Sequence, residues 1–122
     1  MAGAFKRLTD FLVDLGIEKV PHSQKNYLAH LIAVYRLLAE QGCPEELCQA
    51  GMFHSIYGTE LFQGFKLELD QRPLVRGLIG ERAERLGYYN CAMDRAFFDT
   101  EVARGEPPYH FRDRITGEVL PL

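Results

Sequence analysis

Two histidines and one aspartate stand out in this sequence, because their types and spacing suit metal chemistry. His30 follows Tyr27 at helical spacing, so a helix would place both side chains on one apolar face. His54 falls on the apolar face of a second helical stretch in the same way. A later helical stretch is predicted to place Asp94 on its inner face. Aspartate is rarely buried without a cation or a set of hydrogen-bond donors.

Two interpretations of these side chains remain open. A histidine on an apolar helix face is more often a hydrogen-bonded core residue than a ligand. However, burying two imidazoles in one small core is costly unless they share partners or a metal. Two histidines and one carboxylate can hold a divalent manganese, iron or zinc ion with open coordination positions. The spacing therefore predicts a polar centre with His30, His54 and Asp94 as metal ligands.

Two antiparallel helices are needed to bring the histidines together. The first is predicted from Tyr27 onward, and Gly42-Cys43-Pro44 gives a helix stop followed by a helix-starting proline. Ala50 and Gly51 lie on the inner face of the second helix, where small residues let a neighbouring helix come close. This pair of helices would aim one histidine from each towards the interior.

The other elements follow from periodicity and from turn residues. The sequence predicts a mostly α fold in one domain, 1–122, with residues 1–104 forming a compact helical bundle and residues 105–122 a linker and a small C-terminal β-hairpin. The predicted parts are a helix over 4–19, Ser23 as the cap of the next helix, a helix over Asp70–Ile79 with Leu74, Leu78 and Ile79 buried, one long helix over Glu81–Asp99, and a hairpin turn at Thr116–Gly117.

Composition and charge limit the classes of function. A net charge of −3 and a pI near 5.8 argue against broad nucleic-acid binding. No apolar run reaches the length of a membrane span, and a cytoplasmic location is the default expectation. The three cysteines, Cys43, Cys48 and Cys91, are expected to be reduced packing residues. An isolated hairpin is marginal in water, so the C-terminal one is expected to pack on the helices or on the second subunit of a homodimer.

The segment around the histidines resembles the HD superfamily of metal-dependent phosphohydrolases. It is most similar to the small hydrolase domains of guanosine tetraphosphate (alarmone) metabolism. Tyr27 and His30 match the first part of the motif, and AGMFHS over Ala50–Ser55 matches its AA-x-LLHD part. The segment LIGERAERLGYYNCAMDR is similar to the one that brings the last carboxylate ligand, which would be Asp94. The chain also resembles short bacterial proteins that share a LFHSxYGTE signature. The resemblance implies an HD-type helical bundle.

The sequence departs from the HD pattern where the catalytic carboxylates would stand. The aspartate of the HD pair is Ser55 here, and a serine hydroxyl is a poor ligand beside a carboxylate. Gly58 and Thr59 replace the Glu-Asp pair of the alarmone hydrolases, and Glu60 follows directly. A vicinal carboxylate pair would orient or deprotonate the attacking water. The resemblance therefore implies the fold more firmly than the phosphohydrolase reaction.

Two functions follow as hypotheses. The first is a divergent metal-dependent hydrolase acting on a phosphorylated or other anionic small molecule. The second is a catalytically degenerate HD-like module that binds a small molecule or regulates a partner without metal. His22 either reaches the polar centre or is a loop histidine. Separately, the charged pattern of Glu81, Glu84 and Arg85 predicts a solvated helix face. The candidate catalytic residues are Ser55, Tyr57, Thr59 and Glu60, and the candidate substrate-binding residues are His22, Asn90 and Arg95.

Overall fold

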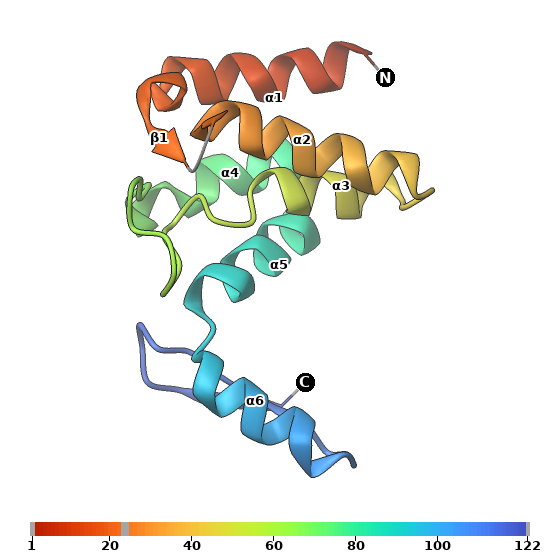
Figure 1. The fold of residues 1–122 in the computed structure, drawn as a ribbon, viewed down its shortest axis with the longest axis vertical. Helices are drawn as coiled ribbons and strands as arrows, with labels where there is room; N and C mark the ends of the chain where they lie inside the picture. Colours follow the sequence, from red (N-terminus) through yellow and green to blue (C-terminus); the bar gives the residue numbers. More distant parts are fainter. Residues whose placement is uncertain (1, 23–24, 122) are drawn as a thin grey trace.

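The chain folds into a mostly helical structure with a small antiparallel hairpin at its C-terminal end, which confirms the predicted fold class. This computed structural model describes residues 2–22 and 25–121, without the side chains of residues 2, 4, 18, 22 and 25. Helices α1 to α4 lie at one end of the long axis, α6 and the hairpin lie at the other end, and α5 connects them (Figure 1). In the part described, no helix combines the length and apolar character needed to cross a membrane.

The first helix is shorter than its predicted span. Helix α1 runs over Ala2–Asp14, and the chain then turns at Gly16, whose φ of 78° is in the left-handed region that favours glycine. A short 3₁₀ helix, η1 (Ile17–Lys19), and a two-stranded ribbon follow, made of β1 (Pro21–His22) and β2 (Lys25–Asn26). Leu8, Leu12 and Ile17 are fully buried and anchor this segment to the core.

Helices α2 (Tyr27–Glu40) and α3 (Glu45–Met52) form the predicted antiparallel pair. Helix α2 is capped by Asn26, whose side chain accepts a hydrogen bond from the Ala29 amide at 2.8 Å, while the predicted cap Ser23 lies outside the described residues. A Cβ atom at Gly51 would lie only 2.4 Å from Leu38 Cδ1. The small side of α3 therefore does allow α2 to approach closely, as predicted.

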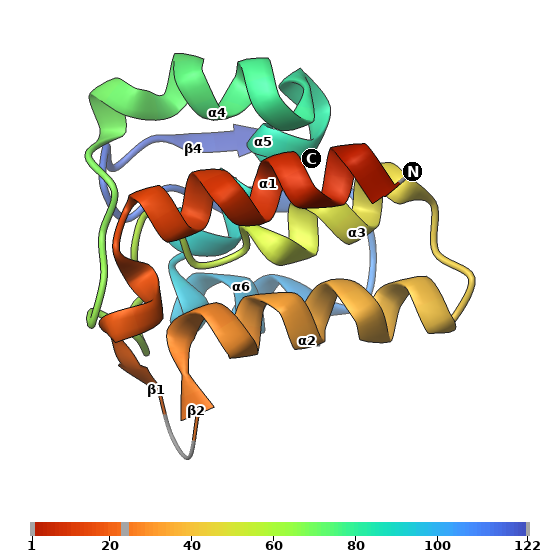
Figure 2. The same ribbon diagram turned by 90° about the horizontal axis from the view of Figure 1, so that it is seen from above.

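The chain between α3 and α5 contains one well-predicted helix. After a 3₁₀ turn, η2 (Leu69–Gln71), helix α4 covers Arg72–Ile79 with a proline in its first turn. The buried residues of α4 are Val75 and Ile79, whereas Leu74 is 52% exposed, so its predicted burial was wrong. Helix α1 lies on the outer side of α2 and α4 (Figure 1), and seen from above it crosses over the space between them (Figure 2).

The predicted long helix over Glu81–Asp99 is two helices, α5 (Glu81–Ala92) and α6 (Arg95–Arg104). Met93 adopts an extended conformation and forms a β-bridge with Asp113 of the C-terminal segment. The Asp94 amide also donates to the Arg112 carbonyl at 3.1 Å. Pairing with a segment far along the chain therefore replaces the helical hydrogen bonds that the local sequence would have allowed.

The C-terminal hairpin has the predicted turn. Strands β3 (His110–Arg112) and β4 (Val119–Pro121) pair with Phe111 opposite Leu120. Gly117 in the turn has a φ of 81°, and the carboxylate of Asp113 accepts hydrogen bonds from the amides of Ile115 and Thr116. Phe111 is buried, so the hairpin packs on the helices as expected.

Candidate functional site

The two histidines of the sequence motif meet in the folded chain. His30 lies on α2, and His54 lies two residues after α3 ends at Met52. Their Nε2 atoms are 3.4 Å apart, and the two rings meet edge to face at an angle of 64°. Both residues are half-buried. The predicted convergence of His30 and His54 is therefore confirmed, although His54 is positioned by the turn that follows α3 and not by the helix itself.

Hydrogen bonds to the backbone hold His54 in place. Its Nδ1 lies 2.6 Å from the Gly51 carbonyl oxygen, which can only accept, so Nδ1 carries a proton and donates it. In the neutral ring, Nε2 then keeps a lone pair directed towards His30. Asn90 donates its side-chain amide to the His54 carbonyl at 2.6 Å, and the Cys91 thiol contacts the same oxygen at 3.3 Å. Asn90 therefore positions His54 through its backbone.

The separation of the histidine nitrogens suits two ligands of one metal ion. Two nitrogens on a tetrahedral zinc, each bonded at about 2.0–2.1 Å, lie roughly 3.3 Å from one another. The His30–His54 distance of 3.4 Å is close to this value and is long for a hydrogen bond. A backbone carbonyl on the other ring nitrogen is also the usual support of a metal-binding histidine. The pair fits two of the coordination positions that an ion would need.

Asp94 does not complete this set. Its carboxylate caps α6 by accepting from the Phe97 amide at 3.0 Å, and it lies 3.7 Å from Arg112 Nε. No group of three or more histidine, cysteine or acidic side chains in the described part of the chain is arranged to hold a metal ion. The predicted His30, His54 and Asp94 triad is thus not assembled, because Asp94 starts a new helix instead of lying on the inner face of α5.

Ser55, which the resemblance aligned with the aspartate of HD domains, directly follows His54 in the chain and is buried. It is 3% exposed, and its hydroxyl shares a hydrogen bond of 2.7 Å with the Tyr27 hydroxyl. Burial raises the pKa of Tyr27 above its ordinary value, although the bond to Ser55 opposes this shift. Both groups are therefore neutral at ordinary pH, and the pair brings no negative charge to the histidines.

Tyr57 belongs to a buried charge network that the sequence did not predict. Its hydroxyl donates to Glu84 at 2.7 Å, and Arg72 makes two hydrogen bonds to the same carboxylate at 2.7 and 2.9 Å. Burial by itself would raise the pKa of Glu84, but the hydrogen bonds and positive charges around it outweigh this effect and lower the pKa. Glu84 is 1% exposed, so its predicted place on a solvated face was wrong.

Thr59 and Glu60 support the loop that follows the histidine. The Thr59 hydroxyl accepts from the amides of Leu61 and Phe62 at 3.2 and 2.9 Å. Glu60 accepts from the Arg95 amide at 2.8 Å, so this carboxylate lies at the start of α6.

The side-chain Nε of Arg95 is buried and makes no hydrogen bond within the described residues. The side chain of His22 lies outside the described residues, although its backbone forms the end of β1.

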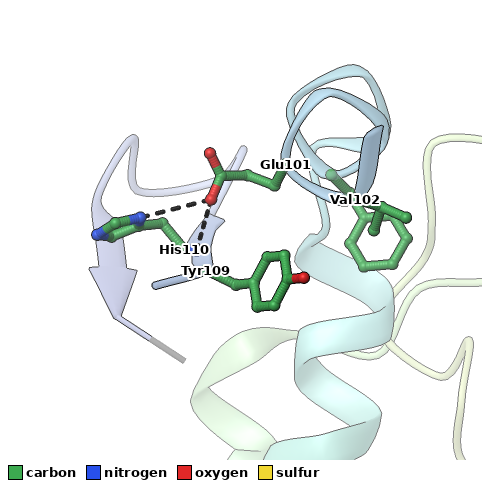
Figure 3. Close-up of a pocket in the computed structure, with 5 residues that line it drawn as sticks. Glu101, Val102, Tyr109 and His110 are labelled. Carbon is green, nitrogen blue, oxygen red and sulfur yellow. Dashed lines mark hydrogen bonds and ion pairs between the residues drawn. The ribbon is translucent and has the colours of Figure 1, made fainter. Parts of the chain in front are cut away.

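An apolar pocket of about 310 Å³ lies between α6 and the hairpin (Figure 3). Phe98 and Val102 of α6 form one wall, and Tyr109 and His110 form the other. The Glu101 carboxylate accepts from the His110 amide at 2.8 Å and lies 3.4 Å from His110 Nδ1. His110 was predicted to be a plain surface residue, but it is half-buried and lines this pocket.

The fold and the site together define a small helical domain in which two half-buried histidines meet. Residues 11–95, which include α2, α3, α4 and α5, match the family described as Domain of unknown function (DUF6817). The chain belongs to this family. No curated protein and no solved structure matches the chain.

Proposed function

We propose that the chain is a catalytically degenerate HD-like domain that binds a small anionic molecule without hydrolysing it. The main support for this proposal is that Ser55 is buried and hydrogen-bonded to another neutral side chain. An aspartate at this position would bring a negative charge to the histidines, whereas Ser55 is buried against the Tyr27 hydroxyl. A neutral pair of hydroxyls neither completes a metal site nor draws a proton from water.

The other candidate catalytic groups support the same proposal. The Tyr57 hydroxyl donates to Glu84, and Glu84 is neutralised by Arg72. Thr59 and Glu60 accept hydrogen bonds from backbone amides. A general base must have a lone pair within reach of the proton that it removes. The hydrogen bonds of Tyr57, Thr59 and Glu60 instead fix the loop after α3.

The first prediction concerns hydrolysis. Incubating the purified protein with guanosine tetraphosphate and manganese is expected to release no pyrophosphate above background, because the carboxylates that would activate water are absent. Chromatographic quantification of the nucleotide products provides the measurement. A His54→Ala variant prepared in parallel identifies any contaminating phosphatase, which would act equally in both samples. Turnover of about 1 per second or more that is lost in His54→Ala would show that the domain is an active hydrolase.

A metal-dependent enzyme is the second candidate, and the distance between the histidines favours it. The 3.4 Å between the two Nε2 atoms matches two ligands on one ion, and the Gly51 carbonyl holds His54 in the tautomer that a ligand requires. Zinc, iron and manganese remain the proposed ions. The predicted carboxylate ligand Asp94 is used as a helix cap, so His30 and His54 would be the two protein ligands of the ion.

The second prediction separates these candidates. If the histidine pair holds an ion, protein purified without a histidine tag should bind zinc, and His30→Ala or His54→Ala should weaken binding by roughly tenfold or more. Calorimetric titration measures the affinity. His110→Ala is the matched control, since His110 lies on the C-terminal hairpin. Equal zinc affinity in all four proteins would place the ion elsewhere and remove the metal-dependent candidate.

The cytoplasm is the proposed location. Cys43, Cys48 and Cys91 are all free, which suits a reducing compartment. Burial raises the pKa of the Cys91 thiol to about 12, so this group stays protonated and acts as a packing residue.

A further inference from the structure

A polar pocket of about 330 Å³ lies beside the loop that carries Tyr57. Its walls come from two parts of the chain that are distant in sequence: the segment after α3, with Tyr57 and the stretch 63–69, and the hairpin turn at residues 114–115. We call it the Lys66–Arg114 pocket, after its two basic side chains. Its size falls at the lower end of the range for small-molecule sites.

The charge of Arg114 is not balanced by any carboxylate within the described residues. Its Nη2 atom donates to the carbonyl oxygens of Gly58 and Cys91, at 3.1 and 2.8 Å. Its Nε is buried and has no hydrogen-bond partner in the part of the chain described. Arg72, by contrast, makes a two-pronged ion pair with Glu84. A half-buried guanidinium held by neutral carbonyls alone favours a nearby anion.

Lys66 supplies a second positive charge to the pocket. No ion pair within the described ranges involves its ammonium group. Its aliphatic stem lies across Gly58, where an added Cβ atom would come within 2.8 Å of Lys66 Cγ. Gly58 also has a φ of 85°, a conformation that side chains disfavour. Glycine at this position therefore allows the Lys66 stem to cross the loop.

The remaining polar groups leave the pocket with a net positive charge. Gln63 donates its side-chain amide to the Thr59 carbonyl, and Tyr57 donates to Glu84. Glu68 is the one carboxylate among the residues that line the pocket, and it is exposed to solvent. The pocket lining therefore has two cations, half-buried Arg114 and exposed Lys66, and one exposed carboxylate, in a chain with a net charge of −3.

We propose that the Lys66–Arg114 pocket binds the phosphoryl group of a small phosphorylated molecule. This inference rests on the proposed function and states where the anion binds and what chemistry it has. A guanidinium presents several N–H donors in a plane to the oxygens of a phosphate, and an ammonium group adds a point charge. The Gly58 backbone links this pocket to the histidine loop, because Arg114 binds Gly58 four residues after His54.

Titration calorimetry with inorganic pyrophosphate, in the presence of EDTA, tests the pocket without any contribution from a metal. Lys66→Gln is expected to weaken binding about tenfold, because it removes one charge-assisted contact. Lys6→Gln is the matched control, since it removes the same charge from an exposed side chain of α1 and should leave the affinity unchanged. Arg114→Lys keeps the charge but loses the planar donor set, and it is also expected to bind about tenfold more weakly. Melting curves of each variant confirm that it is folded.

The outcomes separate this inference from the proposed function. Pyrophosphate affinity that is unchanged in folded Lys66→Gln overturns the pocket. Absence of pyrophosphate binding by the native protein also overturns it. The proposed function is judged separately, by measuring whether the native protein binds guanosine tetraphosphate. If it binds and Lys66→Gln does not weaken the binding, the proposed function is supported and the pocket is rejected. A nucleotide that fails to bind overturns the proposed function as well.

Discussion

Replacing Ser55 with aspartate is expected to lower the free energy of unfolding by about 2–4 kcal/mol. The site is 3% exposed, and the contact of the Ser55 hydroxyl is with the neutral Tyr27 hydroxyl. An added carboxylate would lose its hydration, and the hydrogen bond described for Ser55 offers it no positively charged partner. Under the proposed function, manganese or iron leaves this loss unchanged. Chemical denaturation with and without each metal gives the measurement.

The metal-dependent candidate predicts the opposite response. A carboxylate beside His30 and His54 would add a third, hard ligand, so Ser55→Asp would bind the ion more tightly and melt at a higher temperature once metal is added. Combining Ser55→Asp with His54→Ala is the control, because it removes one nitrogen of the pair. If metal stabilises Ser55→Asp but not the double variant, the domain has a latent metal site and the proposal of a degenerate domain is wrong. Equal stabilisation of both variants would place the ion elsewhere.

Glu84→Gln is expected to lower the free energy of unfolding by about 3 kcal/mol. It would leave the Arg72 guanidinium without its counter-ion, 3.7 Å from the centre of the Tyr88 ring. Glu46→Gln is a matched control, since it makes the same change in an exposed pair with Arg82. That control should cost less than about 1 kcal/mol. Urea denaturation of the two variants distinguishes a buried network from general charge loss.

The pH dependence of this loss follows from the lowered pKa of Glu84. Since the folded-state pKa is depressed, the stabilisation is present above the unfolded value of about 4.3 and disappears as the pH falls through the folded value. The difference in stability between the native protein and Glu84→Gln should therefore shrink below about pH 4. A difference that stays constant down to acid pH would mean that packing, and not the charge, explains the effect.

Local sequence signals predicted the elements that depend on local interactions. The α2–α3 pair followed from apolar spacing and from Gly42-Cys43-Pro44, and the hairpin followed from its Thr-Gly turn. The histidines were found because helical register places His30 inward and a short turn carries His54 to the same place. These features need only neighbours along the chain.

The features that were missed depend on distant partners. No glycine or proline flanks Met93 to stop a helix there, and Met93 instead pairs with Asp113. Asp94 was a recognisable capping residue, but the helical periodicity of the preceding segment outweighed that signal. Glu84 has the pattern of a solvated charge, and its burial becomes evident only when Arg72 packs against it. Sequence periodicity shows which face a residue occupies, and it does not show what covers that face.

The contacts of Arg114 also bear on how the chain is made. This side chain joins the hairpin turn to the Gly58 carbonyl, across 56 positions of sequence, and to Cys91 at the end of α5. During synthesis, α2 and α3 can pair early, because they are adjacent in sequence and local contacts form fast. The loop after His54 obtains its last anchor only when the turn at residues 113–117 has left the ribosome. The histidine pair can therefore assemble before residues 113–117 are synthesised, whereas the wall beside it is completed only after them.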